Sequence, residues 1–172
     1  MITAEEVKQN SENKEFILEA VNQDGKLLEF ASDELKDDKE VILAAINTYA
    51  GSLIFASNRL KDDKEVVFSA TKKEAWTICY ASDKLKADRE IILDGVKQDG
   101  QVLYYASKEL RKDKEVVLEA VKNKGIILKY VSHDLRNDEE VVLEAVKQNK
   151  KAIEFATPEV QKSEAILAIT NE

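Results

Sequence analysis

The sequence predicts an all-α fold built from tandem helical repeats, and three observations support this. A motif recurs every 25 residues, without insertion or deletion, between residues 13 and 162. The chain of 172 residues has one proline and five glycines, and 35% of its residues are charged, a composition that favours helices. Within each copy the apolar residues follow helical spacing. We therefore expect one α-solenoid domain over residues 1–172, and the sequence leaves its right- or left-handed superhelix open.

The repeat frame divides the chain into a cap, six helical hairpins and a partial last helix. Residues 1–12 are expected to form the N-terminal cap, and residues 163–172 a C-terminal capping helix. The six expected repeats are residues 13–37, 38–62, 63–87, 88–112, 113–137 and 138–162. One hairpin alone leaves an apolar face uncovered, so neighbouring copies must stack to bury it.

The first half of each copy is typical of an α-helix. Numbering each copy from 1 to 25, position 1 is Asn or Asp, both good N-caps, and position 3 is Glu, which the helix dipole favours. Positions 4, 5, 8 and 9 are almost all apolar and form one stripe. Gly25, Gly100 and Gly125 at position 13 are interpreted as C′ residues that end the helix. Glutamates at position 3 and basic residues at position 24 predict an exposed ladder of opposite charges.

The second half of each copy predicts another helical stretch. Position 18 is always aromatic, and position 20 is always Ser or Thr. Pro158 directly follows Thr157, and proline suits the first position of a helix. The hydroxyl at position 20 is therefore expected to cap a short helical turn that ends at position 24. The alternative is one continuous second helix, which Pro158 disfavours in the last copy.

Two repeated phrases resemble a known family. Residues 113–123 (DKEVVLEAVKN) and residues 130–137 (YVSHDLRN) are similar to the signature of the tandem repeats called domain of unknown function 4116. The resemblance extends over residues 13–162. It implies a shared repeat fold, and it implies no catalytic residues, because that family has no established activity.

No set of side chains in the sequence is typical of catalysis or metal binding. The one histidine, His133, falls at a variable position and is expected on the surface. The one cysteine, Cys79, has no CxxC partner and is interpreted as a structural thiol. A zinc site needs about four Cys or His ligands, and no glycine-rich phosphate loop is present. We expect a protein that is not an enzyme and has no cofactor or metal, although an acid–base pair of carboxylates remains an alternative.

Charge and cysteine content narrow the classes of partner. The net charge of −8 argues against nucleic acid and anionic membranes, which attract clustered Lys and Arg. No stretch approaches the roughly 20 apolar residues that span a bilayer, and the polar start is unlike a secretory signal. A single cysteine fits a reducing compartment. We therefore expect a cytoplasmic monomer.

Positions 14 and 17 lie three residues apart, so they share a face of the second helical stretch. This face is polar in the first and last copies and largely apolar in the middle ones, while position 10 changes from Asn to Lys. A contiguous exposed apolar strip is unusual unless it binds something, so we predict a protein- or peptide-binding site there. The predicted binding residues are Ile54, Trp76, Cys79, Tyr104, Ile126, Lys72, Lys97 and Lys122.

Three alternatives remain open for these residues. They could simply pack against the neighbouring layer, with Trp76 filling the space beside small residues such as Ala75. The chain could be a structural spacer or a fragment of a longer repeat protein. A nucleic-acid reader with one base per repeat is also conceivable, but the side chain at position 17 differs between copies.

Overall fold

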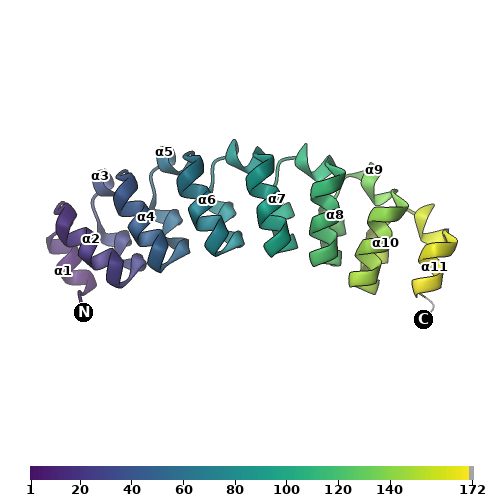
Figure 1. Ribbon diagram of the computed structural model, residues 1–172, viewed down its shortest axis with the longest axis horizontal. Helices are drawn as coiled ribbons and strands as arrows, with labels where there is room; N and C mark the ends of the chain where they lie inside the picture. Colours follow the sequence, from purple (N-terminus) through teal and green to yellow (C-terminus); the bar gives the residue numbers. More distant parts are fainter. Residues whose placement is uncertain (171–172) are drawn as a thin grey trace. The chain divides into compact units, whose positions relative to one another are not determined.

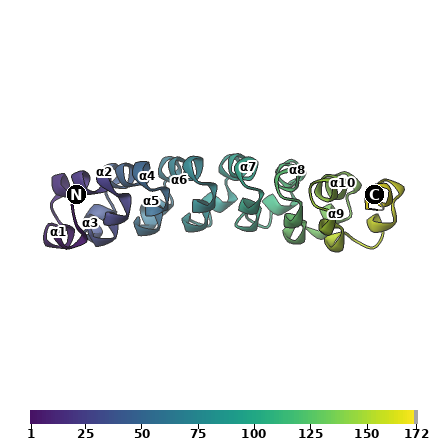
Figure 2. The same cartoon turned by 90° about the horizontal axis from the view of Figure 1, so that it is seen from below.

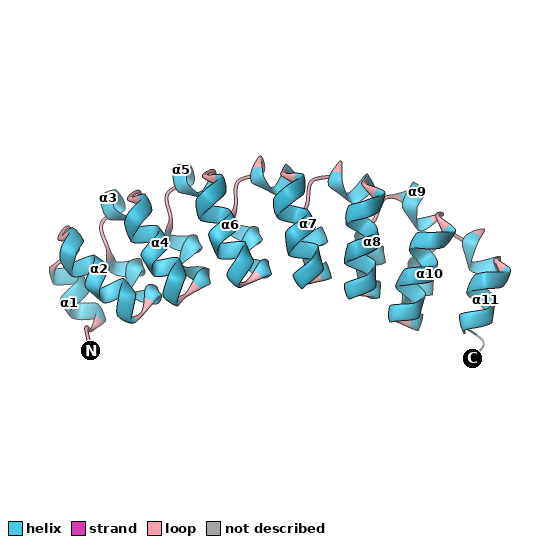
Figure 3. Cartoon of the chain, viewed as in Figure 1, coloured by secondary structure: helices cyan, strands magenta, loops and turns pink. Residues whose placement is uncertain are grey.

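The computed structural model describes residues 1–170, and every regular element within that range is helical (Figures 1 and 3). The chain forms two compact units, residues 1–85 and residues 86–172. None of the helices in the described part of the chain combines the length and apolar character needed to cross a bilayer. The prediction of an all-α chain with a repeating unit is confirmed.

The elements recur with the period seen in the sequence. Each copy contains a ten-residue α-helix, then a 3-10 helix, then a short third helical turn. Unit 1 contains α1 (Ala4–Gln9), α2 (Lys14–Gln23), η1 (Gly25–Phe30), α3 (Asp33–Lys36), α4 (Lys39–Thr48), η2 (Ala50–Phe55), α5 (Asn58–Lys61), α6 (Lys64–Lys73) and η3 (Ala75–Tyr80). After η4 (Leu85–Ala87), unit 2 contains α7 (Arg89–Gln98), η5 (Gly100–Tyr104), η6 (Leu110–Lys112), α8 (Lys114–Asn123), η7 (Gly125–Tyr130), α9 (His133–Arg136), α10 (Glu139–Gln148), η8 (Lys150–Phe155), η9 (Val160–Lys162) and α11 (Glu164–Thr170).

The ten-residue helices begin where the N-cap residues predict. Asp38 has extended backbone angles, and its carboxylate accepts hydrogen bonds from the amides of Glu40 and Val41 at 2.9 and 3.3 Å. These bonds satisfy two amides that otherwise lack a partner in the first turn. Asp63, Asp88 and Asp113 repeat the arrangement at α6, α7 and α8. The predicted capping role of position 1 is confirmed.

The second stretch and the third turn are separate elements. The 3-10 helix η1 ends at Phe30, and Ala31 then adopts extended angles (φ −71°, ψ 159°) before Ser32 caps α3. The Ser32 hydroxyl accepts a hydrogen bond from the Leu35 amide at 3.3 Å. The predicted cap at position 20 is therefore confirmed here, and one continuous second helix is ruled out in this copy.

The glycines at position 13 do not end helices in the predicted way. None of the five glycines has a positive φ, which the predicted C′ role requires. Helix α2 ends instead at Asp24, whose extended angles (φ −151°, ψ 112°) redirect the chain, and Gly25 opens η1. A Cβ atom on Gly25 would lie 2.3 Å from the Ala45 carbonyl oxygen of the next copy. Glycine is needed here because two layers of backbone approach closely.

Each unit has its core between neighbouring copies. Val41, Ile42, Ala45 and Ile46 of α4 are fully buried, as the stripe at positions 4, 5, 8 and 9 predicts. Within unit 1, α4 contacts both α2 and α6, and within unit 2, α8 contacts both α7 and α10. Figure 2 shows the ten-residue helices of each unit side by side in one layer. At roughly 25 cal/mol per Å² of buried apolar surface, this stacking is the main stabilising term.

A backbone hydrogen bond also joins each pair of copies within a unit. The amide at position 20 donates to the carbonyl at position 24 of the preceding copy. The Ser57 amide reaches the Lys36 carbonyl at 3.1 Å, and the Ser107 amide reaches the Lys86 carbonyl at 3.0 Å. This bond satisfies polar groups at the layer junction and holds consecutive third turns in register.

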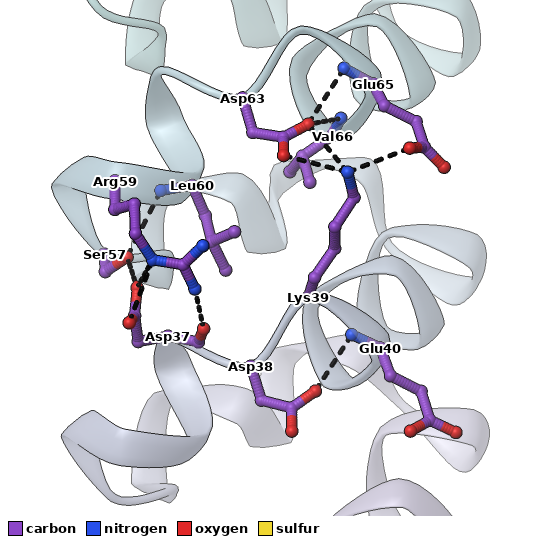
Figure 4. A network of polar contacts seen from close by, with 10 residues as sticks. All are labelled: Asp37, Asp38, Lys39, Glu40, Ser57, Arg59, Leu60, Asp63, Glu65 and Val66. Carbon is purple, nitrogen blue, oxygen red and sulfur yellow. Dashed lines mark hydrogen bonds and ion pairs between the residues drawn. The ribbon is translucent and has the colours of Figure 1, made fainter.

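The charge ladder exists, but its basic partner was predicted wrongly. Lys39, at position 2, bridges Asp63 and Glu65 of the next copy, with Nζ 2.8 Å from an oxygen of each (Figure 4). The hydrogen bond to Asp63 raises the pKa of Lys39. Position 24 has another role, because Lys61 donates instead to the Ile54 carbonyl at 2.7 Å. The basic residue at position 2 therefore reaches the first turn of the ten-residue helix in the next copy, whereas Lys61 at position 24 bonds within its own copy.

Candidate binding surface

Positions 14 and 17 lie on the 3-10 helices, where residues three apart eclipse one another. We call the surface formed by these positions the 14/17 face, and treat it separately in each unit. Ile54, Trp76 and Tyr104 are 43%, 38% and 49% exposed, respectively, so none of them belongs to the buried core. Each of these three side chains is therefore partly open to solvent, including any that also contacts the neighbouring layer.

The 14/17 face of unit 1 centres on Trp76 in η3. Its indole Nε1 donates to a carboxylate oxygen of Glu74 at 2.6 Å, and its ring packs edge-to-face on Tyr80 at a centroid distance of 5.8 Å. Cys79, one 3-10 turn later, is half-buried. Ile54 lies on η2, and burial lowers the pKa of Lys61, which binds the Ile54 carbonyl. Unit 1 thus presents an aromatic ring whose polar atom already has a protein partner.

The 14/17 face of unit 2 contains a pocket walled by three tyrosines. Tyr104 contacts Tyr105 and Tyr130 edge-to-face at centroid distances of 5.0 and 4.7 Å. The pocket has a volume of about 260 Å³. It is lined by Gln101, Tyr104, Tyr105, Lys124, Ile126, Ile127, Lys129 and Tyr130. We call it the tyrosine pocket.

Two lysines give the rim of the tyrosine pocket a positive charge. Lys124 donates from Nζ to Gln101 Oε1 at 2.7 Å, which joins two consecutive copies across the pocket. The Nζ of Lys129 lies 4.6 Å from the centroid of the Tyr130 ring, a cation–π distance. The pocket therefore combines an apolar aromatic wall with basic groups at its mouth.

The position-10 lysines lie on a different element from the tyrosine pocket. Lys72 on α6 places Nζ 4.6 Å from the Phe68 ring centroid, and Lys122 on α8 is 3.5 Å from Glu119. Both contacts are within the same helix, and Lys97 is exposed on α7. None of the three lines the tyrosine pocket. The structure thus groups Tyr104 and Ile126 in one site and leaves the predicted lysines outside it.

The family described as "Domain of unknown function (DUF4116)" matches residues 13–61, 39–86, 63–112, 88–136 and 113–161. This chain belongs to the DUF4116 family. Comparison with curated proteins and with solved structures found no match.

Each DUF4116 match spans two successive copies of the repeat. The match at residues 63–112, for example, contains the copies 63–87 and 88–112. The family unit is therefore a pair of neighbours, which agrees with a core that forms between copies. The tyrosine pocket has the same layout, because η5 and η7 of two successive copies build it.

Sequence analysis missed several residues of this DUF4116 pocket. Tyr105 and Tyr130 occupy the invariant aromatic position 18, a pattern that also fits a packing role. Nothing in the sequence pattern distinguishes Lys124 and Lys129 from other surface lysines. The sequence does contain a signal, since position 18 changes from Phe to Tyr in the copies 63–87, 88–112 and 113–137, where the added hydroxyl needs water or a hydrogen-bond partner.

The other residues of this DUF4116 chain that were considered for catalysis or metal binding do not form a site within the part of the chain that the structure describes. The His133 side chain is 77% exposed, with Nδ1 3.8 Å from Asp134. Within residues 1–170 no three or more His, Cys, Asp or Glu side chains are placed to hold a metal ion together. The tyrosine pocket is therefore the candidate site that the geometry supports best.

Proposed function

We propose that this protein is a non-enzymatic scaffold that binds a protein or peptide through the tyrosine pocket. In this proposal six copies of the repeat stack into an α-solenoid, which works as a cytoplasmic monomer. The observation that carries the proposal is the edge-to-face cluster of Tyr104, Tyr105 and Tyr130 around an open pocket. An exposed tyrosine such as Tyr104 is a common anchor of protein recognition.

The size of the pocket favours one side chain of a polypeptide over a free cofactor. Sites for small molecules typically have volumes of roughly 300–1,000 Å³. The tyrosine pocket, at about 260 Å³, lies below that range, and it is open to solvent beside Tyr104. An apolar side chain of a bound peptide would contact the tyrosine rings, while the remainder of the peptide lies along the 14/17 face of unit 2.

The charge of the rim indicates the flanking chemistry of that peptide. Lys124 and Lys129 lie at the pocket in a protein whose net charge is −8. A peptide with acidic residues beside its apolar anchor would gain from these two lysines and avoid repulsion at the pocket. We therefore propose an acidic peptide with one apolar or aromatic anchor residue as the ligand class.

A peptide-display selection on the full chain tests this proposal. Enriched peptides would be synthesised with a fluorophore and titrated by fluorescence polarisation against wild type and Tyr104→Ala. We expect Tyr104→Ala to weaken binding about tenfold or more, since a central aromatic anchor contributes roughly 2 kcal/mol. Trp76→Ala, which removes an exposed aromatic residue from unit 1, serves as the matched control and should bind like wild type.

Two results would contradict the proposal. The first is a selection whose peptides bind Tyr104→Ala as well as wild type, with both proteins folded by circular dichroism. The second is tight binding of single-stranded RNA with a steep dependence on salt, which would favour a nucleic-acid reader instead.

A further inference from the structure

Two of the position-20 hydroxyls in unit 1, those of Ser57 and Ser82, bond the same kinds of partner. The Ser57 hydroxyl accepts from the Leu60 amide at 3.2 Å and donates to the Asp37 carboxylate at position 25 of the preceding copy (Figure 4). Arg59, at position 22, donates from Nε to the same carboxylate at 3.0 Å. The hydrogen bond from Ser57 and the guanidinium of Arg59 lower the pKa of Asp37. A carboxylate therefore lies between a hydroxyl and a cation.

The next junction in unit 1 repeats this arrangement. The Ser82 hydroxyl donates to Asp62 at 2.6 Å, and Lys84 Nζ lies 3.1 Å from the other oxygen of that carboxylate. Ser82 also caps the following turn through the Leu85 amide at 3.2 Å. Two successive junctions thus use an acid at position 25 as the acceptor for the hydroxyl at position 20.

The junction between residues 88–112 and 113–137 has the opposite charges. Position 25 is Lys112 and position 22 is Asp134, whose side chain is 97% exposed. The Ser132 hydroxyl and Arg111 Nε are both covered, and within residues 1–170 neither atom has a hydrogen-bond partner. Ser132 does not cap α9 through its side chain, although its amide bonds the Arg111 carbonyl at 3.2 Å. The backbone of the junction is therefore intact, and only its side-chain acceptor differs.

At the neighbouring junctions of unit 2, the position-20 hydroxyl has a hydrogen-bond partner within the protein. Thr157 donates to the amide oxygen of Asn137 at position 25. In the copy 88–112, the Glu109 carboxylate accepts from its own backbone amide and from the Ser107 hydroxyl, and these two bonds lower the pKa of Glu109. The unpartnered Ser132 hydroxyl is thus not a general property of position 20.

The residues that carry these unpartnered donors, Arg111 and Ser132, help to line a pocket of about 320 Å³. Its lining contains three basic side chains and one acidic side chain, and the acid, Glu109, already bonds Ser107. The lining residues are Lys108, Glu109, Arg111, Lys112, Tyr130 and Ser132. A covered donor without a partner is unfavourable, and a guanidinium with a nearby ammonium and hydroxyl is a set typical of carboxylate and phosphate recognition.

We propose that Arg111, Lys112 and Ser132 form a site for an oxyanion, either a carboxylate or a phosphate group. The bound oxyanion takes the role that the Asp37 and Asp62 carboxylates have in unit 1, accepting from the hydroxyl at position 20 of the next copy. Tyr130 lines both this site and the tyrosine pocket. The proposal is independent of peptide binding there, because Arg111, Lys112 and Ser132 are not among the residues that line the tyrosine pocket.

Side-chain NMR of the full ¹⁵N-labelled chain provides the test. Inorganic phosphate and sodium acetate would be titrated separately at constant ionic strength while the arginine Nε–Hε signals are recorded. We expect the Arg111 signal to shift and saturate with at least one anion. The Arg136 signal is the internal control and should stay in place, because Arg136 Nε is also covered and unpartnered, whereas the adjacent Thr157 hydroxyl already binds Asn137.

Two variants separate a built site from general charge attraction. Lys112→Asp restores the acid found at Asp62, so it should abolish saturation and raise the melting temperature. Lys97→Asp makes the same charge change at an exposed position on α7 and should leave the titration unchanged. Ser132→Ala should weaken the apparent affinity about threefold to tenfold, the effect of one lost hydrogen bond.

The anion titrations show which kind of oxyanion binds, and they also show whether the proposed site exists at all. Saturation with acetate alone identifies a carboxylate ligand, and saturation with phosphate alone identifies a phosphate ligand. Parallel, non-saturating shifts of Arg111 and Arg136 with both anions would overturn the proposal. Unchanged saturation in Lys112→Asp would overturn it as well, and neither result would affect the peptide titration at Tyr104.

Discussion

At the scale of single residues, Gly25 and Gly51 differ in the atoms that an added side chain would contact. A Cβ atom on Gly25 would lie 2.3 Å from the Ala45 carbonyl oxygen, which belongs to the backbone of the next copy and moves little. A Cβ atom on Gly51 would lie 2.5 Å from Cζ of Tyr49, the far end of a side chain that can rotate. Two glycines of one unit thus differ in the rigidity of the opposing atom.

This difference predicts unequal effects of alanine. Gly25→Ala should lower the free energy of unfolding by about 1–3 kcal/mol, because the two backbone layers must separate. Gly51→Ala should lower it by clearly less, because the Tyr49 ring can move aside. Urea unfolding of both variants measures the difference, and equal losses would contradict the close approach at Gly25.

A second pair of residues tests the capping role of position 20. Ser82 accepts from the Leu85 amide and donates to Asp62, whereas the Ser132 hydroxyl makes neither kind of bond. Ser82→Ala should therefore lower the free energy of unfolding by about 1 kcal/mol, and Ser132→Ala should have almost no effect in anion-free buffer. Thermal denaturation of the two variants would contradict this account if Ser132→Ala proved the more damaging substitution.

At the scale of elements, the start of each ten-residue helix combines a cap with an interlayer ion pair. Asp38 accepts from two amides of α4 and also from Lys14 Nζ at 2.7 Å. Arg89 pairs with both Asp113 and Glu115 in the same way. The hydrogen bonds from Lys14 and Arg89 lower the pKa of Asp38 and Asp113. One carboxylate thus fixes a helix start and ties it to the preceding layer.

The lowered pKa values give a direction for the effect of acid. A carboxylate with a lower pKa in the folded state stabilises that state above its unfolded pKa, and this contribution disappears as pH falls through the folded value. Stability should therefore decrease as pH falls below about 4. Asp38→Asn keeps a cap acceptor but removes the charge, so its free energy of unfolding should change less between pH 7 and pH 3 than that of wild type. Identical pH profiles in urea titrations would rule out this role for Asp38.

The sequence predicts some elements well and others poorly, for physical reasons. The starts of the ten-residue helices were predictable because the N-cap of each is either Asp or Asn, and both residues favour that position. The 3-10 helices were not distinguishable from α-helices, since a segment of six residues makes only about two turns, too few for the spacing of its apolar residues to fix the period. The role of Gly25 required the position of Ala45 in the next copy, which sequence spacing does not give.

The candidate site was predictable in part. The variability of positions 14 and 17 indicated a surface but left packing against the next layer open, and the exposure of Ile54, Trp76 and Tyr104 is a structural finding. The pocket itself depends on the edge-to-face approach of Tyr104 and Tyr130, which belong to different copies. A sequence pattern within one copy does not show how the side chains of two copies pack together, so the pocket could be found only in the three-dimensional structure.

At the scale of the molecule, every interlayer contact described above joins one copy to the next. The backbone bond links position 20 to position 24 of the preceding copy, and the ion pair links position 2 to positions 1 and 3 of the following copy. Stability should then be a sum of copies and nearest-neighbour interfaces. Removing one whole copy should leave each remaining contact with an equivalent partner, since Lys14 can replace Lys39 beside Asp63.

Denaturant unfolding of a chain that lacks residues 38–62 tests this claim most directly. We predict a folded, helical protein that unfolds in one cooperative transition at a lower guanidinium midpoint than the full chain. A control that lacks residues 38–49 breaks the frame and should lose cooperative unfolding. The claim would be contradicted if the whole-copy deletion lost its helical signal or unfolded like the out-of-frame control.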